Sequence, residues 1–125
     1  MEWYSAPDIK RAIKNIITSL SMTYIDRRRV ICFRSSGSTS RARARIWSLP
    51  RVWQKALKVP AYYILEVISE KFDKLSKEDQ DRVLIHELLH IPKNFSGSLL
   101  PHRGRGKKID NILVEKLFQE AKINK

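Results

Sequence analysis

The sequence predicts a small α+β domain over residues 1–125: a mostly antiparallel sheet with an N-terminal, a central and a C-terminal helix. Three observations predict it. The chain has 125 residues, which fits one hydrophobic core. Apolar residues recur at helical spacing near both ends and before Pro92. Short β-branched and aromatic runs, typical of strands, lie between them.

The first half of the chain holds one helix and the strand-like runs. A helix is expected over residues 7–22, where Pro7 suits the first turn and Asp8 suits the positive end of the helix dipole. A Ser/Gly/Thr stretch, residues 35–40, is typical of a loop, and residues 51–57 suit a helical turn. The expected strands are residues 29–34, 41–47 and 61–68.

The central helix is expected from Ser76, whose spacing to Asp79 resembles a capping box, to about Ile91, because Pro92 stops its continuation. Its apolar face points away from His86 on a helical wheel and comprises Leu84, Leu88 and Ile91. Residues 93–106 are expected to be irregular. The last helix is expected over residues 109–123, with an apolar stripe formed by Ile109, Ile112, Leu113, Leu117 and Ala121.

Residues 86–90 read His-Glu-Leu-Leu-His. Histidines four residues apart lie on one face of a helix, about 6 Å apart at Cβ, so two imidazoles can bind one metal ion. Glu87 lies beside them and can reach a water on that ion. The pattern is typical of zinc proteases, in which the glutamate is the general base. The competing interpretation is a histidine pair on an ordinary solvated or core face.

A catalytic zinc usually has three protein ligands and one open position. His102, the third histidine of the chain, lies in the loop after Pro92 and is the first candidate. The alternatives are Glu115, Glu120 and, more remotely, Cys32. We therefore expect one Zn²⁺ per chain, bound by His86, His90 and His102.

A longer stretch resembles a known family. Residues 86–97, His-Glu-Leu-Leu-His-Ile-Pro-Lys-Asn-Phe-Ser-Gly, followed by Pro101-His102-Arg103, are similar to metallopeptidases found in archaea and phages. The similarity covers residues 42–106. It implies a minimal zincin-like domain that hydrolyses peptide bonds, with the three histidines as zinc ligands and Glu87 as base. A weaker likeness is to the SprT-like zinc proteases, although Arg103 here separates the third histidine from Gly104.

Several other side chains are candidates for supporting roles at such a site. Arg103, Tyr62 or Tyr63 could donate to a developing oxyanion, and Glu66 or Asp73 could orient a ligand imidazole. For each of them, an ordinary solvated or packing role is the competing interpretation. By analogy with zincins, residues 61–68 are expected to pair with an extended peptide substrate.

The charge balance suggests a further class of partner. The net charge is +12, which attracts polyanions. Two alternatives therefore stand beside a peptidase acting on protein or peptide: a basic nucleic-acid-binding protein with a zinc site, and a peptidase recruited to DNA- or RNA-bound protein. One cysteine, no secretory signal and no long apolar run predict a cytoplasmic protein. The candidate nucleic-acid contacts are Arg41, Arg43, Arg45, Arg105 and Lys107.

Overall fold

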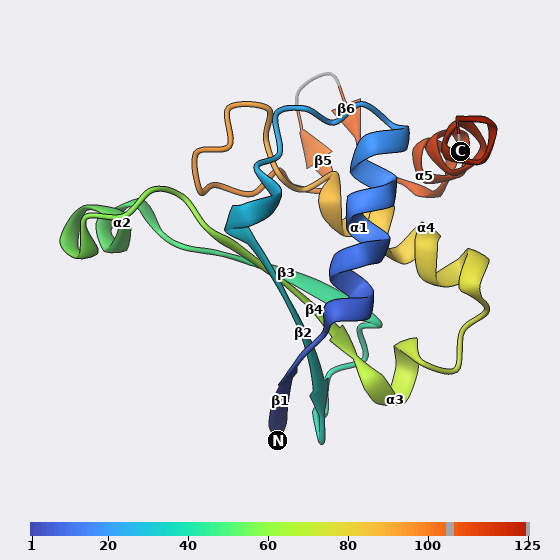
Figure 1. The fold of residues 1–125 in the computed structure, drawn as a ribbon, viewed down its shortest axis with the longest axis horizontal. Coiled ribbons are helices and arrows are strands. Elements are labelled where there is room, and N and C mark those ends of the chain that lie inside the picture. The colour runs from blue at the N-terminus through green and yellow to red at the C-terminus, as the bar shows by residue number, and fades with distance from the viewer. Residues whose placement is uncertain (105–106, 125) are drawn as a thin grey trace.

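The computed structural model describes residues 1–104 and 107–124 (Figure 1). It contains α-helices, one short 3₁₀ helix (η1) and β-strands. Their order is β1 (Glu2–Ser5), α1 (Pro7–Ser19), η1 (Arg27–Arg29), β2 (Val30–Ser36), β3 (Ala44–Ser48), α2 (Arg51–Leu57), β4 (Tyr63–Ile68), α3 (Ser69–Phe72), α4 (Lys77–Leu88), β5 (Arg103–Gly104), β6 (Lys107–Lys108) and α5 (Asn111–Ile123).

The main sheet has the strand order β1-β2-β4-β3. Two of its three pairings are antiparallel, β1 with β2 and β3 with β4, whereas β2 runs parallel to β4. Helices α1, α4 and α5 lie on one side of this sheet, to the right in Figure 1. The predicted α+β class with a mostly antiparallel sheet and three main helices is confirmed.

The core fills the space between this sheet and the helices. Alternate residues of β4, namely Tyr63, Leu65 and Val67, are fully buried and point toward the helices. The predicted apolar face of α4 is confirmed, since Leu84, Leu88 and Ile91 are each at most 1% exposed. Burying each such side chain contributes about 1.5–3 kcal/mol, so this packing fixes the position of α4 on the sheet. The helix α1 adds Ile9, Ile13, Ile16 and Ile17.

Helix α4 begins as predicted but ends earlier. The Ser76 hydroxyl accepts a hydrogen bond from the backbone N–H of Asp79 at 3.1 Å, as a capping residue does. The regular helix stops at Leu88, and a tighter turn follows in which the N–H groups of His90 and Ile91 donate to carbonyls three residues back. His90 therefore lies just beyond the helix.

Two other predictions need correction. Residues 2–5 form strand β1, which sequence patterning did not indicate because all four residues are exposed. The predicted stripe of α5 is wrong at Ile112, which is 81% exposed, whereas its members Ile109 and Ala121 are buried. The prediction missed Val114 and Phe118, which are buried where α4 and α1 pack against the helix. Among the described residues, no helix combines the length and apolar character that crossing a membrane requires.

Candidate metal centre

The end of α4 carries the first two histidines and the glutamate of the motif. His86 is half-buried, whereas His90 and Glu87 are buried, at 8% and 9% exposed. The His86 and His90 ring centroids lie 5.2 Å apart. The two rings therefore lie next to one another, edge-on, although the helix gives way to a tighter turn between them.

A return loop of residues 92–101 brings the third histidine back to this face. The backbone N–H of Leu100 donates to the carbonyl of His90 at 2.7 Å. The Leu100 carbonyl oxygen in turn lies 2.5 Å from His90 Nδ1, so this nitrogen carries the proton and donates it. The arrangement fixes the tautomer of His90 and leaves its Nε2 lone pair free for a metal ion.

The same loop is also held from the sheet side. The Tyr63 hydroxyl accepts a hydrogen bond from the Gly97 N–H at 2.8 Å and donates to the Ser98 carbonyl at 2.9 Å. The Phe95 ring packs edge-on against Tyr63 with centroids 5.0 Å apart. Gln54 of α2 donates to the carbonyls of Leu49 and Ser96. The loop therefore has few conformations available to it as it approaches His102.

The three histidines converge. Their potential ligand nitrogens all lie within 4.8 Å of one another, and His86 Nε2 is 3.0 Å from His102 Nε2. Two nitrogens that each bind one zinc ion at 2.0–2.1 Å in tetrahedral geometry would be about 3.3 Å apart, so the donor set fits such an ion. Burial, together with the charges of His90 and His102, lowers the pKa of His86, which favours the neutral, metal-binding imidazole.

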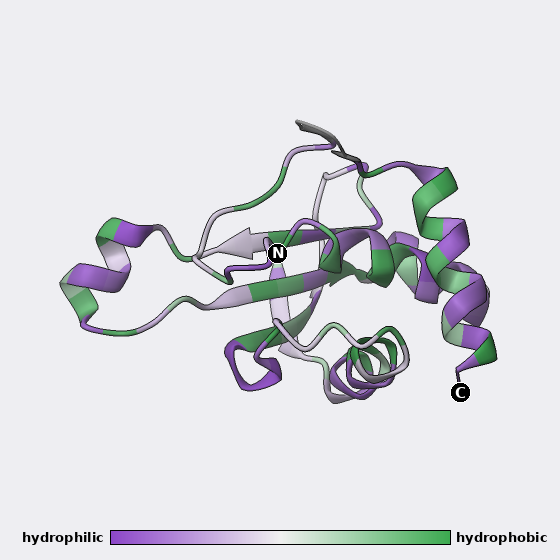
Figure 2. Ribbon diagram, turned by 90° about the horizontal axis from the view of Figure 1, so that it is seen from above, coloured by the Kyte–Doolittle hydropathy of each residue, from purple (hydrophilic) through white to green (hydrophobic). Residues whose placement is uncertain are grey.

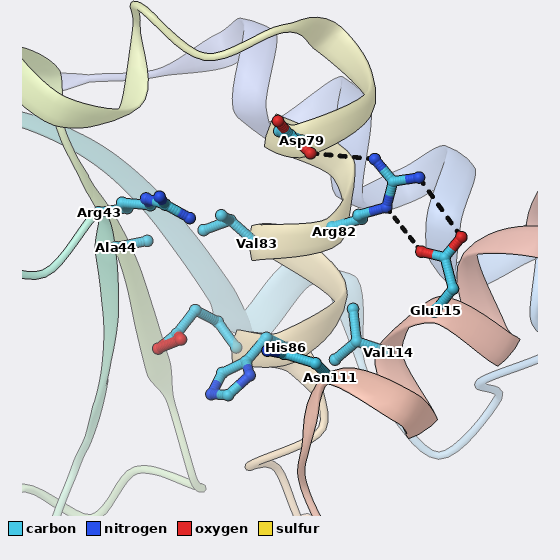
Figure 3. A pocket seen from close by; sticks show the side chains of 10 residues that line it. Arg43, Ala44, Asp79, Arg82, Val83, His86, Asn111, Val114 and Glu115 are labelled. Carbon is cyan, nitrogen blue, oxygen red and sulfur yellow. Dashed lines mark hydrogen bonds and ion pairs between the residues drawn. The ribbon is translucent and has the colours of Figure 1, made fainter.

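Glu87 borders a pocket beside this cluster. Burial raises the pKa of its carboxyl group to about 7. The pocket has a volume of about 320 Å³ and lies between the start of β3, helix α4 and helix α5 (Figure 3). Arg43 and Ala44 line it on the strand side, and Asn111 and Val114 line it on the α5 side. A substrate group in this pocket would be next to both His86 and Glu87.

The rival metal ligands do not join the cluster. Among the described residues, the group that could hold a metal ion consists of the three histidines. Glu115 instead forms an ion pair with Arg82 at 2.8 Å, on the wall of the same pocket (Figure 3). Glu120 is exposed on α5, and Cys32 is buried in the core, where burial raises the pKa of its thiol to about 11.

The structure describes some of the supporting residues that were predicted for this site. Tyr63 is buried and holds the return loop, so the expectation that it reaches an oxyanion is wrong. Asp73 accepts hydrogen bonds from Arg34 and forms none with a histidine among the described residues. Tyr62 is half-buried. The side chains of Arg103 and Lys107, and the whole of Arg105, lie outside the described residues.

Glu66 is also misplaced by the sequence-based prediction. It is 0% exposed but belongs to the sheet face opposite the histidines. Its carboxylate accepts hydrogen bonds from Arg45 at 2.7 Å, from Trp47 at 2.9 Å and from Ser35. Burial opposes ionisation, but these three donors outweigh it and lower the pKa of Glu66. Glu66 therefore neutralises Arg45 and orients no ligand imidazole.

Of the other residues predicted to contact nucleic acid, Arg41 and Arg43 are exposed and lie just before β3.

Sequence reasoning missed the groups that hold the return loop. The acceptor for His90 is a backbone carbonyl, which leaves no trace in the residue type of Leu100. Gly97 was a recognisable signal, because its φ of +96° favours glycine. The role of Gln54, which lies more than 40 residues before Ser96 in the chain, could be found only from the tertiary structure.

The chain matches a family model. No curated protein and no solved structure shows significant similarity to it. The family model described as "Putative phage metallopeptidase" matches residues 1–112, which include the motif helix, the return loop and the N-terminal strands. The match thus extends the similarity expected from residues 42–106 to the first forty residues. The chain belongs to this phage metallopeptidase family.

Proposed function

We propose that this protein is a zinc-dependent metallopeptidase in which His86, His90 and His102 bind one zinc ion and Glu87 is the general base. The convergence of three imidazoles beside a buried glutamate supports the proposal most directly. Three nitrogen ligands leave a fourth position open, as in catalytic zinc sites, whereas structural sites are normally closed by four ligands.

In the proposed hydrolysis, Glu87 transfers protons and the histidines hold the zinc ion. A zinc ion held by these histidines would lower the pKa of a bound water and would polarise a peptide carbonyl. Glu87 accepts a proton from the attacking water and then donates it to the leaving amine. In the metal-free protein, burial raises the pKa of Glu87 to about 7, so its carboxyl group can both accept and donate a proton near neutral pH. His90 keeps its ring orientation through the Leu100 carbonyl.

An extended peptide substrate cannot pair with the strand that the sequence predicted for this role. Residues 61–68 cannot add a peptide strand, because β4 is already paired with β2 on one side and with β3 on the other. Strand β3 is at the edge of the sheet, and its first residue Ala44 and the preceding Arg43 line the pocket beside Glu87. We therefore assign the pairing of an extended peptide to the free edge of β3.

The test compares wild-type protein with Glu87→Gln, measuring metal content by elemental analysis and cleavage of an unstructured, fluorescently labelled protein such as casein. We expect about one zinc per chain in both proteins, with cleavage reduced at least about 100-fold in the variant, the lower range for a general base. Full activity in Glu87→Gln would exclude this mechanism. A zinc-loaded wild-type protein that cleaves no unstructured substrate would contradict the proposed activity.

A further inference from the structure

One face of the sheet carries exposed aromatic side chains. By the strand register, Phe33 and Trp47 point away from the helices, whereas Tyr63 and Leu65 point into the core. Trp3 of β1 lies on the same face, opposite Ser35. Trp3 is 45% exposed and Trp47 is 44% exposed. No helix of the described part of the chain covers this side, to the lower left of the sheet in Figure 1. We call Trp3, Phe33 and Trp47 the aromatic sheet face.

These rings are held in place by the structure. The Trp3 ring lies edge-on to both Phe33 and Trp47, with centroids 6.3 and 6.4 Å apart. The indole N–H of Trp47 donates to the buried Glu66, and the Arg45 guanidinium lies 5.0 Å from the Trp47 ring centroid. Rings fixed in this way bind a flat partner without first losing rotational freedom.

The positive charge of the chain is concentrated in the same segments. Residues 27–68, which span η1, β2, β3, α2 and β4, contain ten Arg and Lys residues against one acidic residue, Glu66. Three of the ten, Arg28, Arg29 and Arg34, pair with carboxylates outside this range. The range accounts for nine of the twelve net positive charges, and its one carboxylate is buried and paired with Arg45. Arg41, Arg51 and Lys55 are exposed and form no ion pair with any described residue. They lie just before β3 and on α2, so cations adjoin both ends of strand β3.

We propose that the aromatic sheet face binds single-stranded nucleic acid, with bases stacked on Trp3, Phe33 and Trp47 and phosphates paired with the cations at the ends of β3. Charge complementarity selects a polyanion, and exposed rings select one whose bases are unstacked. A duplex hides the faces of its bases and so offers these rings nothing to stack on. The inference does not depend on the peptidase activity, since no histidine of the metal centre takes part.

The rival partner is an anionic membrane surface. Helix α2 projects away from the rest of the molecule (Figure 2) and exposes Val52, Trp53 and Leu57 beside its cations. An interfacial helix would insert these residues, whereas nucleic acid would stack on Trp3 and Trp47. Trp53→Leu and Trp3→Leu therefore distinguish the two partners. Trp3 makes no side-chain hydrogen bond that its replacement would break among the described residues.

The experiment measures binding of the protein to a labelled 20-nucleotide single strand and to its duplex by fluorescence anisotropy, over a range of salt concentrations. Binding of the protein to vesicles of phosphatidylcholine with phosphatidylserine is measured separately, by sedimentation with the vesicles. The charge variant Arg41→Gln/Arg51→Gln/Lys55→Gln removes three exposed cations from the segments that adjoin the two ends of strand β3. Its matched control, Arg11→Gln/Lys14→Gln/Lys116→Gln, removes three exposed cations from α1 and α5. All six positions are exposed, so both variants should fold.

We expect the single strand to bind more tightly than the duplex. Trp3→Leu should weaken its binding about tenfold, within the range for loss of one stacked base. A plot of log K against log salt has a negative slope, and the charge variant should reduce its magnitude by about 2, that is about 0.7 for each of three phosphate contacts. The control variant should reduce the magnitude much less. Equal losses in the charge variant and its control, preference for duplex, or vesicle binding that depends on Trp53 would each overturn the proposal.

Discussion

The hydroxyl group of Tyr63 should control how well the chain binds zinc, although it lies outside the histidine cluster. Tyr63→Phe removes the acceptor of the buried Gly97 N–H and the donor to the Ser98 carbonyl, at 2.8 and 2.9 Å. A buried donor left without a partner costs about 1–3 kcal/mol. The loss weakens the docking of the return loop, which leads directly to His102. The phenyl ring still fills the same space, so the core itself should be unchanged.

The expected result is a weaker metal site in a folded protein. We expect zinc affinity to fall about tenfold, the lower end of the range for loss of contacts that orient metal ligands. The affinity is measured by competition with a chromogenic chelator, and the melting temperature of the metal-free protein is followed by circular dichroism. Tyr62→Phe is the matched control, because Tyr62 is half-buried and its hydroxyl forms no side-chain hydrogen bond within the described residues.

One result would refute this reasoning. If Tyr63→Phe lowers the melting temperature while its zinc affinity equals that of wild type, the loop is stabilised by Tyr63 but does not present a ligand. His102 would then have to be excluded from the ligand set. A tenfold loss shared by Tyr62→Phe would instead show a general effect of removing hydroxyl groups from the start of β4.

Three further substitutions test the metal centre and the sheet. His102→Ala should weaken zinc binding by more than the about 100-fold that loss of an outer contact can cause; unchanged affinity in the chelator competition would point to another ligand. Gly97→Ala should destabilise the fold in thermal unfolding, because its Cβ would lie 2.1 Å from Gln54 Nε2 and 2.9 Å from the Leu49 carbonyl at a φ of +96°; a wild-type melting curve would contradict this. Arg45→Met should cost about 3 kcal/mol at pH 7, because it leaves Glu66 buried without its ion-pair partner. The pKa of Glu66 is lowered in the folded protein, so its stabilising effect is present above the unfolded pKa and is lost as the pH falls through the folded one. The cost in urea unfolding should therefore shrink in acid, and an equal cost at pH 7 and pH 3 would argue against the ion pair.

Local sequence patterns predicted the elements that depend on neighbours in the chain. Helical periodicity predicts the spacing of His86 and His90 and the apolar face of α4, and the capping pattern at Ser76 predicts the start of the helix. All three signals lie within one short segment of the chain. The family resemblance came from the same region. Strand β1 escaped notice because an exposed edge strand of four residues has no apolar pattern to reveal it.

The sequence alone therefore determined the histidine motif, the helix that carries it and the excess of positive charge. Only the tertiary structure decided which sheet face each strand residue occupies, since a period of two leaves both faces open until the partners are known. Glu66 and Tyr63 are three residues apart in β4, an odd separation that puts them on opposite faces of the sheet. Glu66 therefore lies beneath the aromatic sheet face, and Tyr63 holds the return loop. The approach of His102 to His86 likewise depends on hydrogen bonds between the return loop and distant groups, which no local pattern encodes. The Leu100 carbonyl accepts from His90, and Tyr63 accepts from the Gly97 N–H and donates to the Ser98 carbonyl.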